Sequence, residues 1–188
     1  MKRYSFCPVC GSRYGDPARI DDSLLLCPSC GFQFWQNSKP TVGALITRVR
    51  DGRPHVLLSR RGGPPLAGSW DLPGGFLANG EPPVDGLVRE LKEELGVRSV
   101  RRVRLMSVDI AEYRSDEGAE EARFVLPMYY RCEIDLDAPI VASDDVAELR
   151  WFPLDGLPAD MAFAADVRAL RDLARQWSAE GAAGSTAD

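Results

Sequence analysis

Three glutamates stand close together in the segment 84–95: Glu90, Glu93 and Glu94. Apolar residues recur at helical spacing through the same segment, which predicts an amphipathic helix with one face packed on a core. At about 100° per residue, the three carboxylates fall within one sector beside the apolar stripe. Like charges three and four residues apart repel each other, so this face is unfavourable unless a cation binds there. Mg²⁺ prefers such carboxylates together with water and phosphate oxygens.

The spacing around the acidic helix is more specific than the acids alone, because most glutamate-rich helix faces are simply solvated. The chain has Gly75, five residues, Glu81, seven residues, the run Arg89-Glu90-Leu91, one residue, Glu93-Glu94, one residue, Gly96 and an aliphatic residue. In these positions it resembles the Nudix hydrolases. The resemblance covers about residues 41–177, and includes an LLxxR-type strand and the run GSWDLPGG ahead of the helix.

The resemblance implies both a fold and a set of site roles. The fold would be of the α/β class, an α/β/α sandwich with a mixed sheet, and the reaction would be hydrolysis of a diphosphate linked to another moiety, with Mg²⁺ or Mn²⁺ as cofactor. Glu90 and Glu94 would be the main metal ligands, Glu93 a third ligand or the proton acceptor, and the Gly75 carbonyl a further ligand. Arg89, four residues before Glu93, is placed to pair with it and to orient the cluster.

Two roles in this site stay open at the level of sequence. Glu90 or Glu93 could act as the general base from within the helix, and several loop carboxylates could act from outside it. These loop acids are Glu148, Asp145, Glu120 and Glu121. Arg60 and Arg61 close a strand and are candidates for binding a substrate phosphate, although a solvated strand end explains them equally well.

Four cysteines near the start of the chain predict a second metal site. Cys7 and Cys10 form one CxxC pair, Cys27 and Cys30 form another, each pair is followed by glycine, and sixteen residues separate the pairs. This is the spacing of a four-cysteine zinc ribbon, and a site with four thiolate ligands has no open position for catalysis. We therefore predict a structural Zn²⁺ that folds a segment too small to have its own core.

The expected organisation is a zinc ribbon over residues 1–38, a Nudix domain over residues 39–178 and a disordered tail over residues 179–188. Aromatic residues follow the second cysteine pair: Phe32, Phe34 and Trp35. They would cover the ribbon and dock it on the next domain, or else form a dimer face or a surface for stacking bases. A homodimer is an expectation by analogy only.

A ribbon ahead of a Nudix domain resembles the NADH pyrophosphatases and a group similar to plastid FAD and ADP-ribose diphosphatases. The segment after the helix lacks the SQPWPFPxS array of the NADH group, which argues against NADH and NAD-capped RNA. We expect a small-molecule substrate: a nucleoside diphosphate derivative such as FAD, ADP-ribose or NADH. The alternatives are a nucleotide-sensing or RNA-binding regulator that uses the ribbon as its interaction module, and a hydrolase of nucleoside triphosphates.

Composition narrows the range of partners. The formal net charge is −5, so broad electrostatic attraction to nucleic acid is not expected. No apolar run approaches the roughly 20 residues needed to cross a bilayer, and the start of the chain has no signal-peptide apolar core. These features predict a cytoplasmic protein that does not enter a membrane.

The remaining elements are read from periodicity. Strands are expected over 42–50, 55–61, 103–113, 124–134 and 148–154, and a helix over 160–177. Pro127 suggests an edge strand or a bulge. Trp70 and Leu72 are expected in the core, Cys132 as a small buried hydrophobe, and His55, the only histidine, as exposed and not catalytic.

Overall fold

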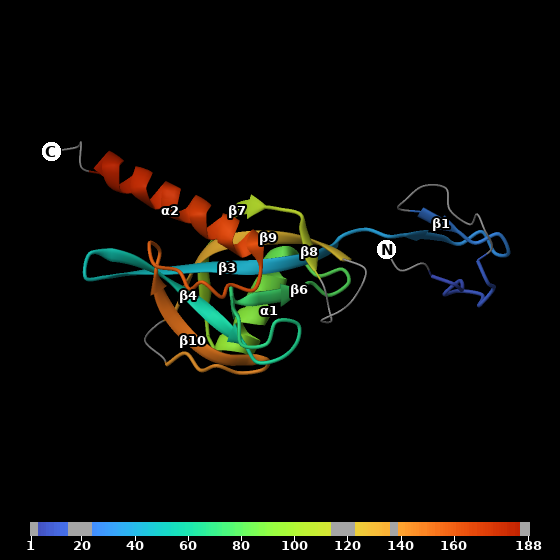
Figure 1. Ribbon diagram of the computed structural model, residues 1–188, viewed down its shortest axis with the longest axis horizontal. Coiled ribbons are helices and arrows are strands. Elements are labelled where there is room, and N and C mark those ends of the chain that lie inside the picture. The colour runs from blue at the N-terminus through green and yellow to red at the C-terminus, as the bar shows by residue number, and fades with distance from the viewer. Residues whose placement is uncertain (1–3, 15–23, 114–122, 136–138, 185–188) are drawn as a thin grey trace.

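The computed structural model describes residues 4–14, 24–113, 123–135 and 139–184 (Figure 1). Its elements, in chain order, are β1 (Leu24–Leu26), β2 (Gln33–Trp35), β3 (Lys39–Arg50), β4 (Arg53–Arg61), β5 (Trp70–Asp71), β6 (Gly74–Phe76), α1 (Pro83–Leu95), β7 (Val100–Val108), β8 (Ala111–Tyr113), β9 (Arg123–Ile134), β10 (Val146–Pro153) and α2 (Ala164–Gly184).

A mixed sheet forms the centre of the molecule. Its main path runs β10-β4-β3-β9-β7, while β5 pairs with β4, β6 with β3 and β8 with β9. Strand β3 pairs in parallel with β9 and antiparallel with β4 and β6. The long strand β3 therefore pairs with three other strands, and the short strand β6 lies along its N-terminal end.

The two helices cover opposite faces of this sheet, because successive side chains of a strand point to opposite sides. On β3, Ala44 and Ile46 pack with the helix α1, whereas Leu45 between them packs with α2. Strand β4 shows the same alternation, with Leu57 on the α1 side and its two neighbours on the α2 side. The α/β/α sandwich and mixed sheet predicted from the sequence are confirmed.

The acidic helix forms as expected. Pro83 begins α1, where the missing amide hydrogen of proline costs nothing, and Gly96 ends it in the left-handed conformation at φ 66°. Leu87, Leu91 and Leu95 are fully buried and fix which face of the helix turns to the sheet. The glutamates are therefore carried on a rigid element whose rotation about its own axis is set by the core.

Pro127 lies in an interior strand, so the expectation of an edge strand is wrong. Strand β9 runs between β3 and β7. The strand next to β9 is interrupted beside Pro127, because β7 ends at Val108 and β8 starts at Ala111. In this gap the backbone N–H of Asp109 donates to the Pro127 carbonyl at 3.1 Å. Proline has no amide hydrogen to donate, and the break in the neighbour removes the need for one. The single strand expected over 103–113 is therefore two strands, β7 and β8, separated by this break.

The C-terminal helix is longer than its periodicity suggests. It begins at Ala164 and continues to Gly184, past the expected end at Trp177, so part of the segment assigned to a disordered tail is helical. Figure 1 shows its last turns extending away from the sheet. Trp70, Leu72 and Cys132 are buried, as expected, and His55 is partly exposed.

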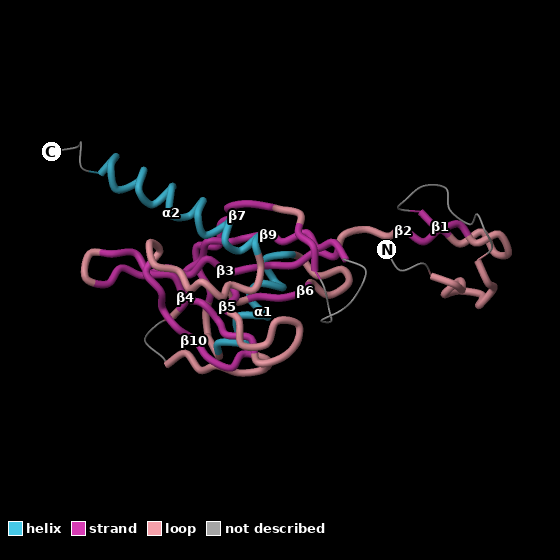
Figure 2. The backbone as a smooth tube through the Cα atoms, viewed as in Figure 1, coloured by secondary structure: helices cyan, strands magenta, loops and turns pink. Residues whose placement is uncertain are grey.

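The ribbon forms a separate small sheet, in which β1 and β2 pair antiparallel (Figure 2). Phe34 packs inside this unit, with its ring edge-on to Tyr4 at a centroid distance of 4.8 Å, while Trp35 is exposed. Among the described residues, no helix combines the length and the apolar character that a membrane crossing requires.

The packing of α1 makes a first prediction. Leu91→Ala removes a side chain that is 0% exposed, and the cavity left under the helix should lower the free energy of unfolding by about 2–5 kcal/mol. Val84→Ala on the same helix, where the side chain is 43% exposed, should change it by less than about 0.5 kcal/mol. Urea unfolding of the two variants measures the difference. Equal losses would mean that α1 is not anchored through this face.

Candidate metal centres and active site

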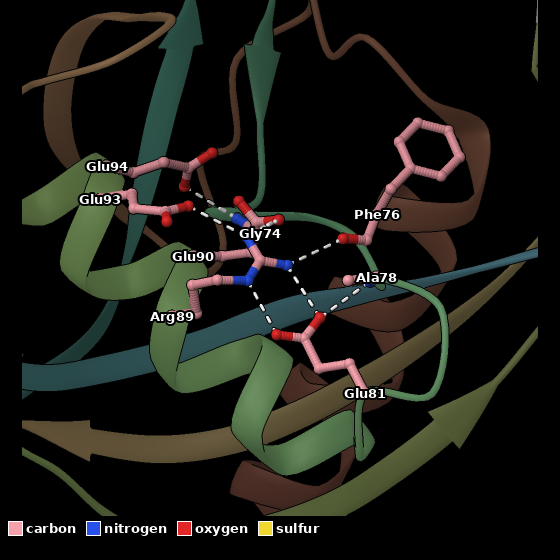
Figure 3. A network of polar contacts seen from close by, with 8 residues as sticks. All are labelled: Gly74, Phe76, Ala78, Glu81, Arg89, Glu90, Glu93 and Glu94. Carbon is pink, nitrogen blue, oxygen red and sulfur yellow. Dashed lines mark hydrogen bonds and ion pairs between the residues drawn. The ribbon is translucent and has the colours of Figure 1, made fainter.

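The Arg89 guanidinium is the centre of the polar network on α1 (Figure 3). It donates to Glu90 Oε1 at 2.8 Å and to Glu93 Oε2 at 3.0 Å, which confirms the expected pairing with Glu93 and adds Glu90. It also donates to the Phe76 carbonyl at 3.0 Å, and so ties the helix to the end of β6. One cation thus fixes the positions of two carboxylates and of the strand they face.

Glu81 is the residue whose role the sequence did not reveal, although its position in the motif was evident. Its two oxygens accept from Arg89 Nε at 2.8 Å and Nη2 at 2.9 Å, and Oε2 also accepts from the backbone of Ala78 at 2.8 Å. A two-point pair of this kind fixes the plane of the guanidinium. The hydrogen bonds from Arg89, followed by that from Ala78, lower the pKa of Glu81 to about 2. Glu81 therefore anchors Arg89.

Two glycines let the helix carboxylates approach β6. Glu94 is only 6% exposed, and its Oε2 accepts from the Gly74 backbone N–H at 2.9 Å. A Cβ on Gly75 would stand 2.6 Å from Glu90 Oε1, and a Cβ on Gly74 would stand 2.1 Å from the Val42 carbonyl oxygen. Gly74 also has a φ of 142°, which side chains rarely tolerate. A larger residue at position 75 would push the Glu90 carboxylate away, and one at position 74 would push β6 away from β3.

Burial dominates the electrostatics of these carboxylates. It raises the pKa of Glu94 to about 9, against the lowering effect of the Gly74 hydrogen bond, and the negative charges of Glu90, Asp145 and Asp71 add to the increase. Burial also raises the pKa of Glu90, although Arg89 partly opposes it. Buried acids that repel one another bind protons or cations readily, and a divalent ion would relieve both burial and repulsion.

The donor set fits a hard divalent cation such as Mg²⁺. It consists of carboxylates on adjacent turns of one helix, and Arg89 bonds to only one oxygen of Glu90 and one of Glu93. The three carboxylates do not converge as tightly as the cysteines: in the described part of the chain, only Cys7, Cys10, Cys27 and Cys30 bring three or more ligand atoms within 4.8 Å of one another. The Gly75 carbonyl stays a predicted ligand.

A pocket of about 170 Å³ lies beside β6. Gly74 and Gly75 line it, and the same two glycines contact Glu94 and Glu90 of α1. Polar lining residues include Arg61, Asp71, Asp145 and Asp166. The carboxylate cluster and the pocket are thus adjacent parts of one site.

The predicted residues outside the helix divide clearly. Arg61 lines the pocket, whereas Arg60 is tied to the Gly68 carbonyl at 2.8 Å and lies 3.6 Å from Glu148. Glu148 also pairs with Arg150 and does not line the pocket. Asp145 does line it, and a hydrogen bond from the Gly62 backbone to the Asp145 carbonyl, 2.6 Å long, holds its loop in place. Glu120 and Glu121 lie outside the described residues.

Other residues of the pocket had weaker sequence signals. Tyr113 and Phe163 stack against each other at 5.8 Å on one side of it. Asp71 lies in the run GSWDLPGG between Trp70 and Leu72, and these apolar neighbours indicate a core strand rather than a polar site. Asp166 falls at helical spacing with the buried Ala169, Leu170 and Leu173. An acid on the apolar stripe of a helix was the signal that could have identified it.

The four cysteines form a centre that fits Zn²⁺. Four ligands at about 2.3 Å from zinc, in a tetrahedron, lie about 3.8 Å from one another. The Sγ atoms of Cys7 and Cys30 are 3.8 Å apart, and those of Cys10 and Cys27 are 3.6 Å apart. The two pairs turn in the same way, because Gly11 and Gly31 adopt φ values of 71° and 74° and donate to the Cys7 and Cys27 carbonyls. The clustering predicted from spacing is confirmed.

Comparison with known proteins agrees with the motif. The NUDIX domain family matches residues 37–173, and the chain belongs to this family. It is 26% identical over 160 residues to the NAD-capped RNA hydrolase NudC of Stutzerimonas stutzeri strain A1501, covering 85% of this chain and 51% of the relative. The chain thus spans about half the length of the NudC relatives it matches.

Two other similarities cover more of the related protein. A putative 8-oxo-dGTP diphosphatase 3 of Mycobacterium tuberculosis is 30% identical over 169 residues, which are 87% of this chain and 76% of that protein. The crystal structure of a MutT NUDIX hydrolase from Burkholderia pseudomallei superposes with a TM-score of 0.58 at 31% identity, covering 72% of this chain and 98% of that one. The resemblance found in the motif is therefore confirmed at the level of sequence and fold.

The cysteine centre predicts the zinc content of the protein. The intact chain should carry one Zn²⁺, and Cys27→Ser should reduce this strongly, because Cys27 is a buried member of the cluster. Cys132→Ala, a change at the buried cysteine of β9, should leave the zinc content unchanged. Atomic emission measurement of purified proteins tests both. Full zinc occupancy in Cys27→Ser would show that the metal is bound elsewhere.

Glu94 predicts how stability depends on pH. Its folded pKa of about 9 lies above its ordinary value of 4.5, so its contribution to stability is fully present below about pH 4.5 and is lost as pH rises toward 9. Without Mg²⁺ or Mn²⁺, Glu94→Gln should therefore gain melting temperature relative to the parent between pH 5 and pH 9. Adding Mg²⁺ should stabilise the parent more than the variant.

Glu93→Gln is the matched control for this measurement, because the Glu93 side chain is 47% exposed. This variant should gain less melting temperature than Glu94→Gln, because an exposed carboxylate carries little desolvation cost. A difference between Glu94→Gln and the parent that does not change with pH would contradict the burial of the Glu94 carboxyl in the metal-free protein.

Proposed function

We propose that the protein hydrolyses the diphosphate bond of a nucleoside diphosphate linked to another moiety, and that the reaction depends on Mg²⁺ or Mn²⁺. The observation that carries this proposal is the geometry around β6. Glu90 and Glu94 contact its glycines, and the same glycines line a pocket. A diphosphate lying across the end of β6 would reach the carboxylates while the rest of the substrate enters the pocket.

The chemistry follows from the positions of the side chains. A divalent ion, when bound, supplies charge neutralisation for the phosphate oxygens and lowers the pKa of water. Glu90 and Glu94 would hold it, and Arg89 keeps Glu90 and Glu93 in place. A water oxygen attacks one phosphorus, its proton passes to a carboxylate, and the bond between that phosphorus and the bridging oxygen breaks.

Among the candidate bases, the structure favours Glu93 and Asp145 over Glu148. Glu93 is the most exposed of the three helix glutamates, and Arg89 engages only its Oε2. Asp145 lines the pocket and is close enough to raise the pKa of Glu94. Glu148 of β10 forms ion pairs with Arg60 and Arg150, and it would have to break both to act as the general base. Arg61 lines the pocket, paired with Asp71, and Arg60 does not line it, so we assign the substrate-side role to Arg61.

The substrate class rests on several partial arguments. The zinc ribbon and the NudC relatives favour a dinucleotide such as FAD, ADP-ribose or NADH, while the absence of the SQPWPFPxS array from the segment after α1 argues against NADH itself. The Mycobacterium tuberculosis relative, named for an oxidised guanine nucleotide, makes a nucleoside triphosphate the second candidate.

A regulator that senses a nucleotide would not need the full set of metal-binding acids. Here Glu90, Glu93 and Glu94 are all present and are arranged around Arg89. The enzyme is therefore the better proposal, and binding of a partner or RNA by the ribbon, a homodimer and a cytoplasmic location stay predictions.

A panel of dinucleotides and nucleoside triphosphates with Mg²⁺ or Mn²⁺ tests the proposal by release of nucleotide products. Glu93→Gln and Glu94→Gln should each lower kcat/KM by roughly 10²–10⁴-fold, the usual scale for loss of a positioned acid or base. Glu133 lies on β9 and forms an exposed ion pair with Arg102 of β7, so Glu133→Gln should leave activity unchanged. Activity that survives both helix substitutions would favour the sensor.

A further inference from the structure

Strand β7 and the turn before it carry a local concentration of positive charge. Four arginines stand in the segment 98–104, which reads RSVRRVR: Arg98, Arg101, Arg102 and Arg104. All four are exposed, and they are called the β7 arginine surface below. The chain has no acid between Glu94 and Asp109, although its formal net charge is −5. The surface therefore reverses the overall charge over a short stretch of chain.

A bulge in β7 brings two of these side chains to the same face of the sheet. Arg101 lies opposite Glu133 of β9 and Arg104 lies opposite Arg131, with a register shift between the two pairs. In a regular strand, residues three apart point to opposite faces. Glu133 and Arg131 are two residues apart and share a face, so the extra residue of β7 places Arg101 and Arg104 on that face together. Arg102 lies in the bulge at φ 51° and pairs with Glu133 at 3.0 Å.

This face is the one that α2 covers farther along the sheet. Tyr129, two residues before Arg131, packs in the core under α2. The Arg131 guanidinium lies 4.9 Å from the ring centroid of Trp177 on the same helix. Strand β7 is the outer strand of the sheet path, and none of its arginines lines the pocket beside β6. The β7 arginine surface is therefore separate from the candidate active site.

The arrangement is unfavourable for the isolated protein. Arg104 and Arg131 are directly opposite each other, and like charges in such a cross-strand pair are destabilising. Among the described residues Arg98, Arg101 and Arg104 form no ion pair. A charge and a bulge on an outer strand do prevent pairing with another chain. One arginine beside the bulge would achieve this, so protection of the edge does not account for four.

The chemistry of the surface fits a chain of phosphates. Guanidinium groups bind phosphate oxygens through two parallel hydrogen bonds. At about 3.3 Å per residue of the neighbouring strand, Arg101 and Arg104 are roughly 6–7 Å apart along the sheet edge. The cations thus form an open row and not a closed pocket, which suits a linear polyanion better than a single small anion.

Two other kinds of partner fit the surface less well. An added peptide strand would need a continuous ladder of backbone hydrogen bonds, and the bulge with its positive φ at Arg102 interrupts that ladder. An anionic membrane would need apolar side chains beside the cations. The exposed Leu105 and Val108 lie opposite Tyr130 and Met128, which pack on the α1 side of the sheet, so they point away from the arginines.

We propose that the β7 arginine surface binds the phosphate backbone of a single-stranded nucleic acid. A single strand offers one row of phosphates that one row of arginines can follow, whereas a duplex is read by elements that enter its grooves. The net charge of −5 opposes long-range attraction, so binding is local and weakens readily in salt. This binding is a further activity and does not depend on the proposed hydrolysis.

Fluorescence anisotropy of labelled oligouridine and oligothymidine, each of about 12 nucleotides, tests the proposal on the full chain. The parent should bind both alike, because phosphate contacts carry no sequence information. Arg101→Gln/Arg104→Gln should weaken binding by roughly 10-fold at about 50 mM salt. It should also reduce the slope of log affinity against log salt by about 1.4, because each phosphate contact on a single strand contributes about 0.7. Arg101→Lys/Arg104→Lys keeps both charges and should keep the slope.

The matched control is Arg50→Gln/Arg53→Gln on the β3–β4 hairpin, where both arginines are exposed. It changes the net charge equally and should bind as the parent does. The melting temperature of Arg101→Gln/Arg104→Gln should not fall below that of the parent, because the change relieves the repulsion at Arg131. Its turnover of ADP-ribose should match the parent, because neither changed residue lines the pocket.

Three results would overturn the inference. The first is no binding of either oligonucleotide by the parent at about 50 mM salt. The second is equal weakening by the β7 and hairpin double variants, which would mean that only net charge matters. The third is tighter binding of polyglutamate or of anionic lipid vesicles than of the oligonucleotides, lost in the same β7 variant. Oligonucleotide binding without hydrolysis of any nucleotide would support this inference and overturn only the proposed function.

Discussion

The ion pair between Arg89 and Glu81 is the constraint on which the active site depends. Glu90 and Glu93 lie on the same helix and repel each other, and a helix alone gives their side chains many rotamers. Two parallel hydrogen bonds to Glu81 fix the Arg89 guanidinium, which then holds one oxygen of each helix acid and the carbonyl at the end of β6. The carboxylates are thereby oriented before any cation or substrate arrives, which lowers the entropic cost of binding.

Strand β6 joins the two halves of the site. It pairs with β3, and its glycines have no side chains on either surface, so the Glu90 carboxylate and the pocket approach the same short piece of backbone. The two apolar cores on opposite faces of the sheet hold α1 and the start of α2 in register with this strand. The carboxylates carried by α1 and the pocket residues carried by α2 therefore lie beside the same short strand.

The zinc ribbon follows a different physical principle from the rest of the chain. Its sheet has only two short strands, and among its described residues the few buried side chains are the thiols of Cys7 and Cys27 together with Leu24 and Leu25 of β1. The Nudix domain is stabilised by leucines, isoleucines and valines on both faces of an eight-stranded sheet. A metal bound by the four cysteines would supply folding free energy to the ribbon, whereas the domain that follows it is stabilised by apolar burial.

The sequence by itself determined the family, the acidic helix, the pairing of Arg89 with Glu93 and the cysteine centre, because each is encoded by local spacing along the chain. That Asp145 and Arg61 line the pocket while Glu148 and Arg60 do not, and that Pro127 lies in an interior strand, was decided only by the tertiary structure. The same holds for the group formed by Asp71, Tyr129 and Asp166, whose members come from three elements far apart in sequence. Which of two neighbouring residues faces the site depends on strand pairing and on which loop carbonyls they meet, and these contacts exist only once the sheet has formed.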